Sequence, residues 1–132
     1  MMVGRKLGLI GLMALIGLIG CSRVSREEQA MDAACEYYEA LLEGDYEAFL
    51  EGRVHMDSIP DGFREQLLAS YKQFMYQQKE AHQGVESFTP SCVQEDSTLQ
   101  VMQVFLMVNY SDSTHEEIVV PMVERDGEWK MK

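Results

Sequence analysis

The stretch TLQVMQVFLMVNY, residues 98–110, is the strongest strand signal in this chain of 132 residues. Because side chains alternate between the two faces of a strand, its apolar residues fall on both faces. One face holds Met102, Val104, Leu106 and Val108, and the other holds Leu99, Val101, Phe105 and Met107. We therefore predict a central strand that is covered by helices on one side and by a partner or a loop on the other.

Turn-forming residues on either side of this strand predict three further strands. The expected order is a strand at 85–95 with a bend or an edge at Pro90, a turn at 96–97, the central strand, a turn at 111–114, and a returning strand at 116–124. Asp126-Gly127 is then typical of a two-residue type I′ hairpin turn. In the last strand we expect Trp129 and Met131 to point inward, and Lys130 and Lys132 to point outward.

Helical periodicity precedes the strands. Ser25 and Glu28 fit a capping box, and a helix is predicted from Glu27 to Glu43, ended by Gly44. Its apolar face holds Ala30, Met31, Ala34, Tyr38, Leu41 and Leu42, and its opposite face holds Asp32, Glu36, Glu39 and Glu43. We interpret the acidic stripe as the solvated face. The alternative is a docking face for a basic partner or divalent cations, although the sequence lacks the spaced oxygen ligands of a known calcium loop.

Two more helices are predicted before Gly84. Asp45 can cap a short helix through Phe49 that ends near Gly52, and a third helix begins around 58–61 with Pro60 in its first turn. The buried face of this third helix is expected to collect Phe63, Leu67, Tyr71, Phe74 and Met75. Helices followed by strands predict an α+β domain whose two kinds of element are segregated.

Residues 1–20 have the pattern of a cleaved signal peptide. Arg5 and Lys6 precede fourteen uncharged residues, which are too few to cross a bilayer core of about 30 Å. The simpler interpretation is a buried core helix, but the four glycines of this segment would each cost roughly 1 kcal/mol in a helix interior. The segment is therefore excluded from the predicted domain, which spans 27–132.

The residues Leu18, Ile19, Gly20 and Cys21 resemble the lipobox of bacterial lipoproteins. The resemblance implies that signal peptidase recognises the first three and cuts before Cys21, whose sulfur and amine become acylated. Two or three acyl chains would hold the protein stably at a membrane, joined to the domain by a short tether at 21–26. Ser22 stands where an aspartate would favour the inner membrane in some bacteria, so we expect a cell-envelope protein at the outer membrane.

The composition of the expected mature chain argues against several classes of function. Cleavage before Cys21 leaves 112 residues with all 22 acidic and 9 of the 11 basic side chains, a formal charge of −13. Nucleic-acid binding is not expected from such a charge. His55, His82 and His115 lie far apart, and the sequence has no CxxC, HExxH or GxGxxG motif, so neither a metal nor a cofactor is predicted.

Two short motifs carry a resemblance to a known family. GDYEAF (44–49) follows the first amphipathic helix, and DGEWKMK (126–132) closes the chain. In their order and spacing they resemble small lipoproteins of Gram-negative bacteria that carry a nuclear transport factor 2-like, or cystatin-like, domain. The resemblance implies a curved four-stranded antiparallel sheet wrapped around N-terminal helices into a cone, often with a cavity at its open end. Many such domains dimerise through the sheet, and most of the lipoprotein members have no established reaction.

Some relatives of that family are ketosteroid isomerase-like or dehydratase-like enzymes, which need an acid or a base inside the cone. The candidates here are Tyr71, Gln78 and His82 on the third helix, with Gln103 on the central strand, as the lining of a pocket. No carboxylate is placed beside His82 by spacing. The simpler interpretation is that His82 lies in the last helical turn, where a cationic side chain is favoured by the helix dipole.

Cys35 and Cys92 are the remaining cysteines, and export would place them in an oxidising compartment. A disulfide between them would close a loop of 57 residues and stabilise the fold by roughly 4 kcal/mol. Free cysteines also pack well in cores, so both states are open. A nucleophilic role is not predicted, because no histidine is positioned near either residue by sequence.

The sequence thus favours a lipid-anchored, non-catalytic envelope protein. Its expected partners are the membrane, through the acyl chains on Cys21, and another envelope protein or a second copy at the apolar outer face of the sheet. A small apolar ligand in the cone is a further interpretation. The alternative is an isomerase- or dehydratase-like enzyme acting on such a ligand.

Overall fold

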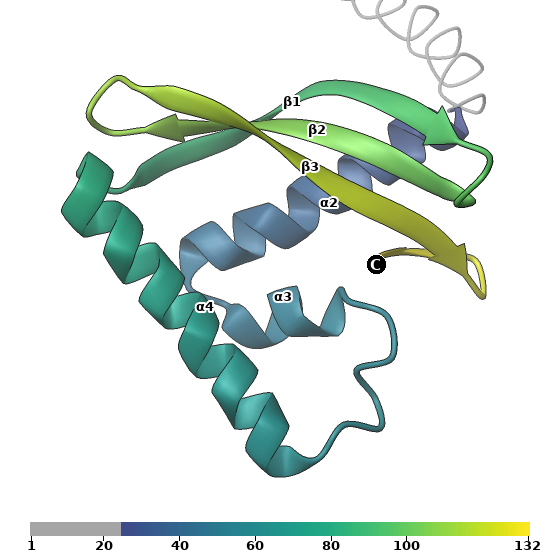
Figure 1. The fold of residues 1–132 in the computed structure, drawn as a ribbon, viewed down its shortest axis with the longest axis horizontal. Coiled ribbons are helices and arrows are strands. Elements are labelled where there is room, and N and C mark those ends of the chain that lie inside the picture. The colour runs from purple at the N-terminus through teal and green to yellow at the C-terminus, as the bar shows by residue number, and fades with distance from the viewer. Residues whose placement is uncertain (1–24) are drawn as a thin grey trace, which may run out of the picture.

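The computed structural model describes residues 25–132, so the signal-peptide and lipobox predictions for residues 1–21 lie outside the described residues. Helices α2 (Arg26–Glu43), α3 (Tyr46–Glu51) and α4 (Asp61–His82) come first. Strands β1 (Val85–Asp96), β2 (Val101–Tyr110), β3 (His115–Arg125) and β4 (Glu128–Met131) follow. The helices lie on one side of a twisted antiparallel sheet (Figure 1). The predicted α+β order is confirmed.

Both ends of α2 form as their sequences predict. The Ser25 hydroxyl accepts a hydrogen bond from the Glu28 backbone N–H at 3.1 Å, which satisfies one free donor of the first turn. At the other end Gly44 adopts a left-handed conformation, φ 86°, and its N–H bonds back into the helix. Ala30, Ala34 and Leu41 are buried, while the acidic stripe of Asp32, Glu36, Glu39 and Glu43 is exposed.

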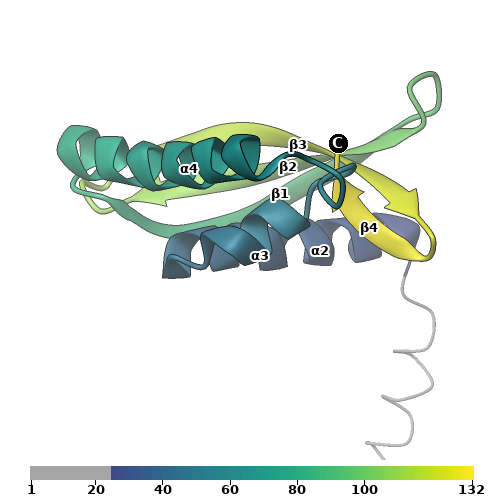
Figure 2. The same cartoon turned by 90° about the horizontal axis from the view of Figure 1, so that it is seen from below.

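The sheet has the strand order β1-β2-β3-β4, so β2 is an interior strand as predicted. β1 is at the edge, and its register with β2 shifts between Pro90 and Cys92. Proline has no N–H for the ladder and is tolerated at such positions. The turn to β4 is the predicted type I′ hairpin: Asp126 and Gly127 have φ values of 52° and 80°. Seen from below, α4 passes in front of the strands, and α2 and α3 lie alongside the sheet (Figure 2).

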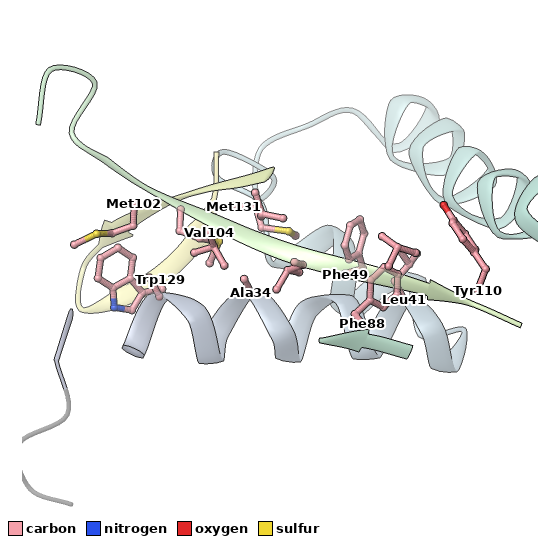
Figure 3. Close-up of a cluster of buried hydrophobic side chains, with 14 residues drawn as sticks. Ala34, Leu41, Phe49, Phe88, Met102, Val104, Tyr110, Trp129 and Met131 are labelled. Carbon is pink, nitrogen blue, oxygen red and sulfur yellow. The ribbon is translucent and has the colours of Figure 1, made fainter. Parts of the chain in front are cut away.

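The core lies between α2 and the inner face of the sheet (Figure 3). Val104 and Leu106 of β2 are 0% exposed, and Met122 of β3 packs beside them with the same exposure. Trp129 and Met131 are buried as expected, whereas Lys132 is exposed. The Tyr37 hydroxyl donates a 2.6 Å hydrogen bond to the Trp129 carbonyl, which fastens α2 to the last strand.

Two expectations about the apolar residues are wrong. No residue of α4 is buried, and Phe63 and Phe74 are 47% and 43% exposed. The side of α4 that faces the rest of the fold is a stripe of half-buried residues spaced alternately four and three apart: Arg64, Leu68, Tyr71, Met75, Gln78 and His82. Phe63 and Phe74 lie on the flank of that stripe, because α4 meets the rest of the fold along a narrow line. Leu99 lies in the turn before β2 rather than in the strand, and the Asp96 carboxylate accepts its backbone N–H at 3.1 Å.

The cysteines are not joined in the structure: Cys35 and Cys92 are both free thiols. Cys35 is half-buried on α2, against the inner side of the sheet. Cys92 pairs with Phe105 on the outer face of β1 and β2 and is exposed. The sheet therefore separates the two sulfur atoms, which sequence spacing could not reveal.

Candidate functional site

The four residues predicted to line a pocket do not share one. Tyr71, Gln78 and His82 follow the half-buried stripe of α4, but Tyr71 and His82 are eleven residues apart, roughly 16 Å along the helix. Gln103 lies between Met102 and Val104, which are 3% and 0% exposed in the core. Because side chains alternate along a strand, Gln103 points from the outer face of the sheet, away from α4.

His82 instead belongs to a cluster at the end of α4. Its Nδ1 lies 3.1 Å from Asp112 Oδ2 and 3.4 Å from the Thr114 hydroxyl, and its ring stacks on Tyr110 with centroids 4.0 Å apart. The Asp112 N–H also donates to the His82 carbonyl at 3.1 Å. Hydrogen bonds from Thr114, followed by that from His82, hold the pKa of Asp112 below its ordinary value. Glu116 accepts a hydrogen bond from the Tyr110 hydroxyl.

Asp112 is the residue that sequence reasoning missed beside His82. The register of β1 on β2 explains why Asp112 lies beside His82. Val85 at the start of β1 pairs with Tyr110 at the end of β2. That pairing brings the segment just before β1 close to the turn just after β2, although 30 residues separate the two side chains.

The His82 cluster has the residue types of a catalytic triad but not its geometry. In a triad, one ring nitrogen faces the carboxylate and the other faces the nucleophile. Here Asp112 and the hydroxyl of Thr114 both meet Nδ1, and Thr114 also donates to the Asp112 carboxylate. The arrangement orders the β2–β3 turn against the last turn of α4. These contacts are structural, and we call the group of His82, Asp112 and Thr114 the clasp.

Aromatic side chains from three helices and β1 pack together on the helix-facing side of the sheet. Tyr38 meets Phe49 edge to face at 5.1 Å and Phe88 at 5.1 Å, and Tyr71 covers Phe49 at 4.9 Å. Such edge-to-face pairs contribute about 0.5–1.5 kcal/mol beyond their buried area. No polar or charged residue in 25–132 is buried, so the interior of this part of the chain is apolar.

The outer face of the sheet is apolar at its centre. Phe105 of β2 is half-buried and is flanked by Cys92 on β1 and Val119 on β3. Val119 is 50% exposed, and half-buried Met107 lies next along β2 on the same face. We call these four residues the sheet-face patch. Burial of apolar surface of this kind drives protein association.

A polar cleft of about 650 Å³ opens beside the end of α3. It lies between the loop after α3, the start of α4 and the β3–β4 hairpin. The lining residues are Glu51, Arg53, Val54, His55, Met56, Asp57, Arg64, Arg125, Asp126, Glu128 and Lys130. The cleft could not be found from the sequence, because its residues come from three separate segments of the chain, 51–57, 64 and 125–130.

Residues 25–132 have neither a group of metal ligands nor a helix suited to span a membrane. Within that range no three His, Cys, Asp or Glu side chains are grouped to hold a metal ion. The helices of the same range are not apolar enough over a sufficient length to cross a membrane.

Comparison with known proteins bears on the fold. No protein-family model and no curated protein matches the chain. The structure is similar to the crystal structure, at 2.00 Å resolution, of a candidate nuclear transport factor 2-like transpeptidase from Campylobacter jejuni. The match has a TM-score of 0.60 at 12% identity and covers 76% of this chain and 94% of that one. The described part of the chain therefore has a nuclear transport factor 2-like fold.

Proposed function

We propose that this protein is a lipid-anchored, non-catalytic envelope protein that docks a partner through its sheet-face patch. The observation that carries the proposal is the position of Phe105, flanked by Cys92 and the half-exposed Val119 on an interior strand. An aromatic side chain at the centre of an open sheet face is typical of interface cores. The simplest partner is a second copy, because a two-fold axis near Phe105 sets the patch against itself. Another envelope protein with an apolar surface is the second candidate.

Self-association of the purified protein tests the docking face. We expect concentration-dependent dimerisation in sedimentation velocity, weakened by Val119→Glu, because a buried unpaired carboxylate would oppose association. Leu99→Glu is the matched control: Leu99 is 56% exposed and apolar, like Val119, but lies in a turn outside the patch. If both variants sediment like the wild-type protein as monomers, a second copy is not the partner.

Cys92 provides a chemical reporter on the same surface. A thiol-specific bifunctional cross-linker should join two copies through Cys92, which is exposed, and Cys35→Ala should leave the yield unchanged. The same reagent on intact cells should join Cys92 to a different envelope protein if the partner is not a second copy. Cross-linked products that persist unchanged in Val119→Glu would contradict the patch as the docking surface.

The lipid anchor is part of the proposal, supported by the lipobox residues Leu18, Ile19, Gly20 and Cys21. In cells fed an alkyne fatty acid, the wild-type protein should become labelled and sediment with outer membranes. Cys21→Ser should lose the label and no longer sediment with outer membranes, since the acyl chains supply the membrane affinity there. Membrane association that is unchanged in Cys21→Ser would rule out this anchor.

We do not extend the activity named for the Campylobacter jejuni protein to this chain. Covalent acyl transfer needs an activated nucleophile beside a base. Burial, followed by the carboxylates of Glu39, Asp32 and Glu36, raises the pKa of the Cys35 thiol, so the thiolate is disfavoured at neutral pH. His82 is engaged at Nδ1 with Asp112 and Thr114, as described above. These contacts support a non-catalytic role.

A further inference from the structure

The cleft beside α3 holds half of the basic side chains in the described part of this acidic protein. Residues 25–132 contain eight Lys and Arg side chains, and four of them line this cleft: Arg53, Arg64, Arg125 and Lys130. The carboxylates of Glu51, Asp57, Asp126 and Glu128 line it too. The cleft therefore differs from the exposed acidic stripe of α2, where the charge has a single sign.

The cations are held more deeply than the carboxylates that pair with them. The side chains of Arg64 and Lys130 are 28% and 27% exposed, whereas those of Glu51 and Glu128 are 65% and 70% exposed. Arg64 Nη2 lies 3.6 Å from Glu51 Oε1, and Lys130 Nζ lies 3.3 Å from Glu128 Oε2. Both distances exceed the roughly 2.7–2.9 Å of a strong charge-assisted hydrogen bond. Because exposed ion pairs of this kind contribute only about 0–1 kcal/mol, a ligand can displace these carboxylates.

The Arg53 side chain is held in place by Tyr71, and its guanidinium has further N–H donors beyond the one used in that contact. Its Nη1 donates to the Tyr71 hydroxyl at 3.1 Å, and the Tyr71 ring is itself held edge to face against Phe49 at 4.9 Å. The Arg53 backbone forms a β-bridge with Met131. A guanidinium has five N–H donors, and within residues 25–132 no carboxylate forms an ion pair with this one. A guanidinium held in this way is suited to bidentate contact with a carboxylate.

We propose that the cleft binds a small ligand through a carboxylate group, seated on Arg53 and Arg64 in place of the Glu51 side chain. The acidic residues at the same cleft, Asp57, Asp126 and Glu128, would repel a polyanion. A ligand with a single carboxylate therefore fits better than a polyphosphate. A free organic acid and the C-terminus of a short peptide share this chemistry.

Binding is tested on the purified protein by NMR titration with acetate, with N-acetyl-alanyl-alanine, and with the C-terminal amide of that dipeptide. We expect saturable shifts of the amide signals at 53–57 and at Arg64 with one or both acids, and none with the amide. Acetate alone would identify a general acid site, and the dipeptide alone would identify a peptide C-terminus. Equal shifts with the acid and the amide, or no saturable shift with either acid, would overturn the proposal.

Variants assign the binding to the named residues. Arg53→Gln should weaken binding by roughly tenfold or more, in line with the loss of a charge-assisted hydrogen bond. Lys72→Gln is the control, because it removes the same charge from an exposed position of α4 outside the cleft. Glu51→Gln should tighten binding, since it removes one of the two exposed carboxylates that pair with Arg64, the other being Glu47 at 3.5 Å. This result does not depend on the folding of the Arg53 variant. Equal affinity in Arg53→Gln and Lys72→Gln, or weaker binding in Glu51→Gln, would contradict the site.

Discussion

Tyr110 connects the core to the surface cluster at the end of α4. The residue is 4% exposed, its ring stacks on His82, and its hydroxyl donates to the Glu116 carboxylate. Burial, followed by the hydrogen bond to Glu116, raises the pKa of Tyr110 to about 12. The phenol is therefore held neutral in the folded protein at a pH where the unfolded chain, with a tyrosine pKa of about 10, already ionises.

This difference predicts a loss of stability in alkali. The raised pKa of Tyr110 in the folded state contributes to the stability of the protein. This contribution is present in full below about pH 10, and it is lost as the pH rises through the pKa of folded Tyr110, about 12. At pH 11 the loss from Tyr110 should be about 1.4 kcal/mol relative to pH 8. Urea unfolding of the wild-type protein and of Tyr110→Phe at both pH values measures it. The variant should lose less stability between the two pH values, and an equal loss in both proteins would contradict the assignment to Tyr110.

Gly52, Gly127 and Gly62 differ in whether the structure leaves room, and a suitable backbone conformation, for a side chain. A Cβ atom on Gly52 would lie 2.5 Å from the Tyr37 ring, and that ring is fixed by its hydrogen bond to the Trp129 carbonyl. Gly127 is open to solvent but has a φ of 80° in the type I′ turn. Gly62, near the start of α4, has neither restriction.

Alanine substitutions at these three glycines should therefore change the stability of the fold in different directions. Gly52→Ala should destabilise the fold by about 1–3 kcal/mol through overpacking, and Gly127→Ala by roughly 1 kcal/mol through backbone strain. Gly62→Ala should stabilise it by about 0.5–1 kcal/mol, because alanine is the better helix former. Thermal unfolding of the three variants measures the order of their stabilities. A destabilised Gly62→Ala protein would mean that the start of α4 has a packing partner outside the described residues.

Helix α4 is the least anchored of the long elements. No side chain of this 22-residue helix is buried, and its contacts with the core pass through Tyr71 and Met75. Elements with few buried contacts open at lower free energy than the rest of a protein. The clasp of His82 with Asp112 and the ion pairs of Arg64 hold its two ends.

Hydrogen exchange should therefore separate α4 from α2. Amides in α4 should exchange faster than those in α2, where Ala30 and Ala34 are 0% exposed. Tyr71→Ala should accelerate exchange in α4 further and leave β2 and β3 almost unchanged, as read by mass spectrometry of peptic fragments. Uniform exchange of α2 and α4 in the wild-type protein would show that both helices open together with the whole domain.

The molecule as a whole has an excess of negative charge. The chain carries 22 acidic and 11 basic side chains, and Asp32, Glu36, Glu39 and Glu43 form one exposed stripe on α2. Like charges four residues apart on a helix destabilise it by roughly 0.2–0.5 kcal/mol per pair. Repulsion between exposed charges is screened once the Debye length falls to about 3 Å in 1 M salt.

Sodium chloride should accordingly raise the midpoint of thermal unfolding. Glu36→Gln removes one member of the stripe and should both raise the midpoint in low salt and reduce the response to salt. Arg26→Gln is the opposing control, because Arg26 is an exposed cation paired with Glu124 at 3.2 Å. A midpoint that falls with salt in the wild-type protein would show that attractive ion pairs outweigh the repulsion.

The element order, the turn residues and the inward face of β2 could be predicted because each depends on neighbours within one segment. Gly44 ends a helix and Asp126-Gly127 makes a hairpin through local backbone preferences. The exposure of Phe63 and Phe74 could not be predicted, because helical periodicity defines an apolar face but not how much of it another element covers. The separation of Cys35 from Cys92 by the sheet likewise follows from the layers of the fold.

The candidate sites depend still more on tertiary contacts. Half of the sheet-face patch was predictable, since alternation along 98–110 places Phe105 and Met107 opposite the core residues Val104 and Leu106. Its other members, Cys92 and Val119, follow from the strand register, and Val101, expected on the same face, is 4% exposed. The clasp of His82 with Asp112 required the register of β1 on β2, and the cleft of Arg53 and Arg64 required three segments to meet. Local sequence thus defined the elements and their apolar faces through backbone preference and side-chain periodicity. Long-range packing, which brings distant charges to one place, defined the cleft and the clasp.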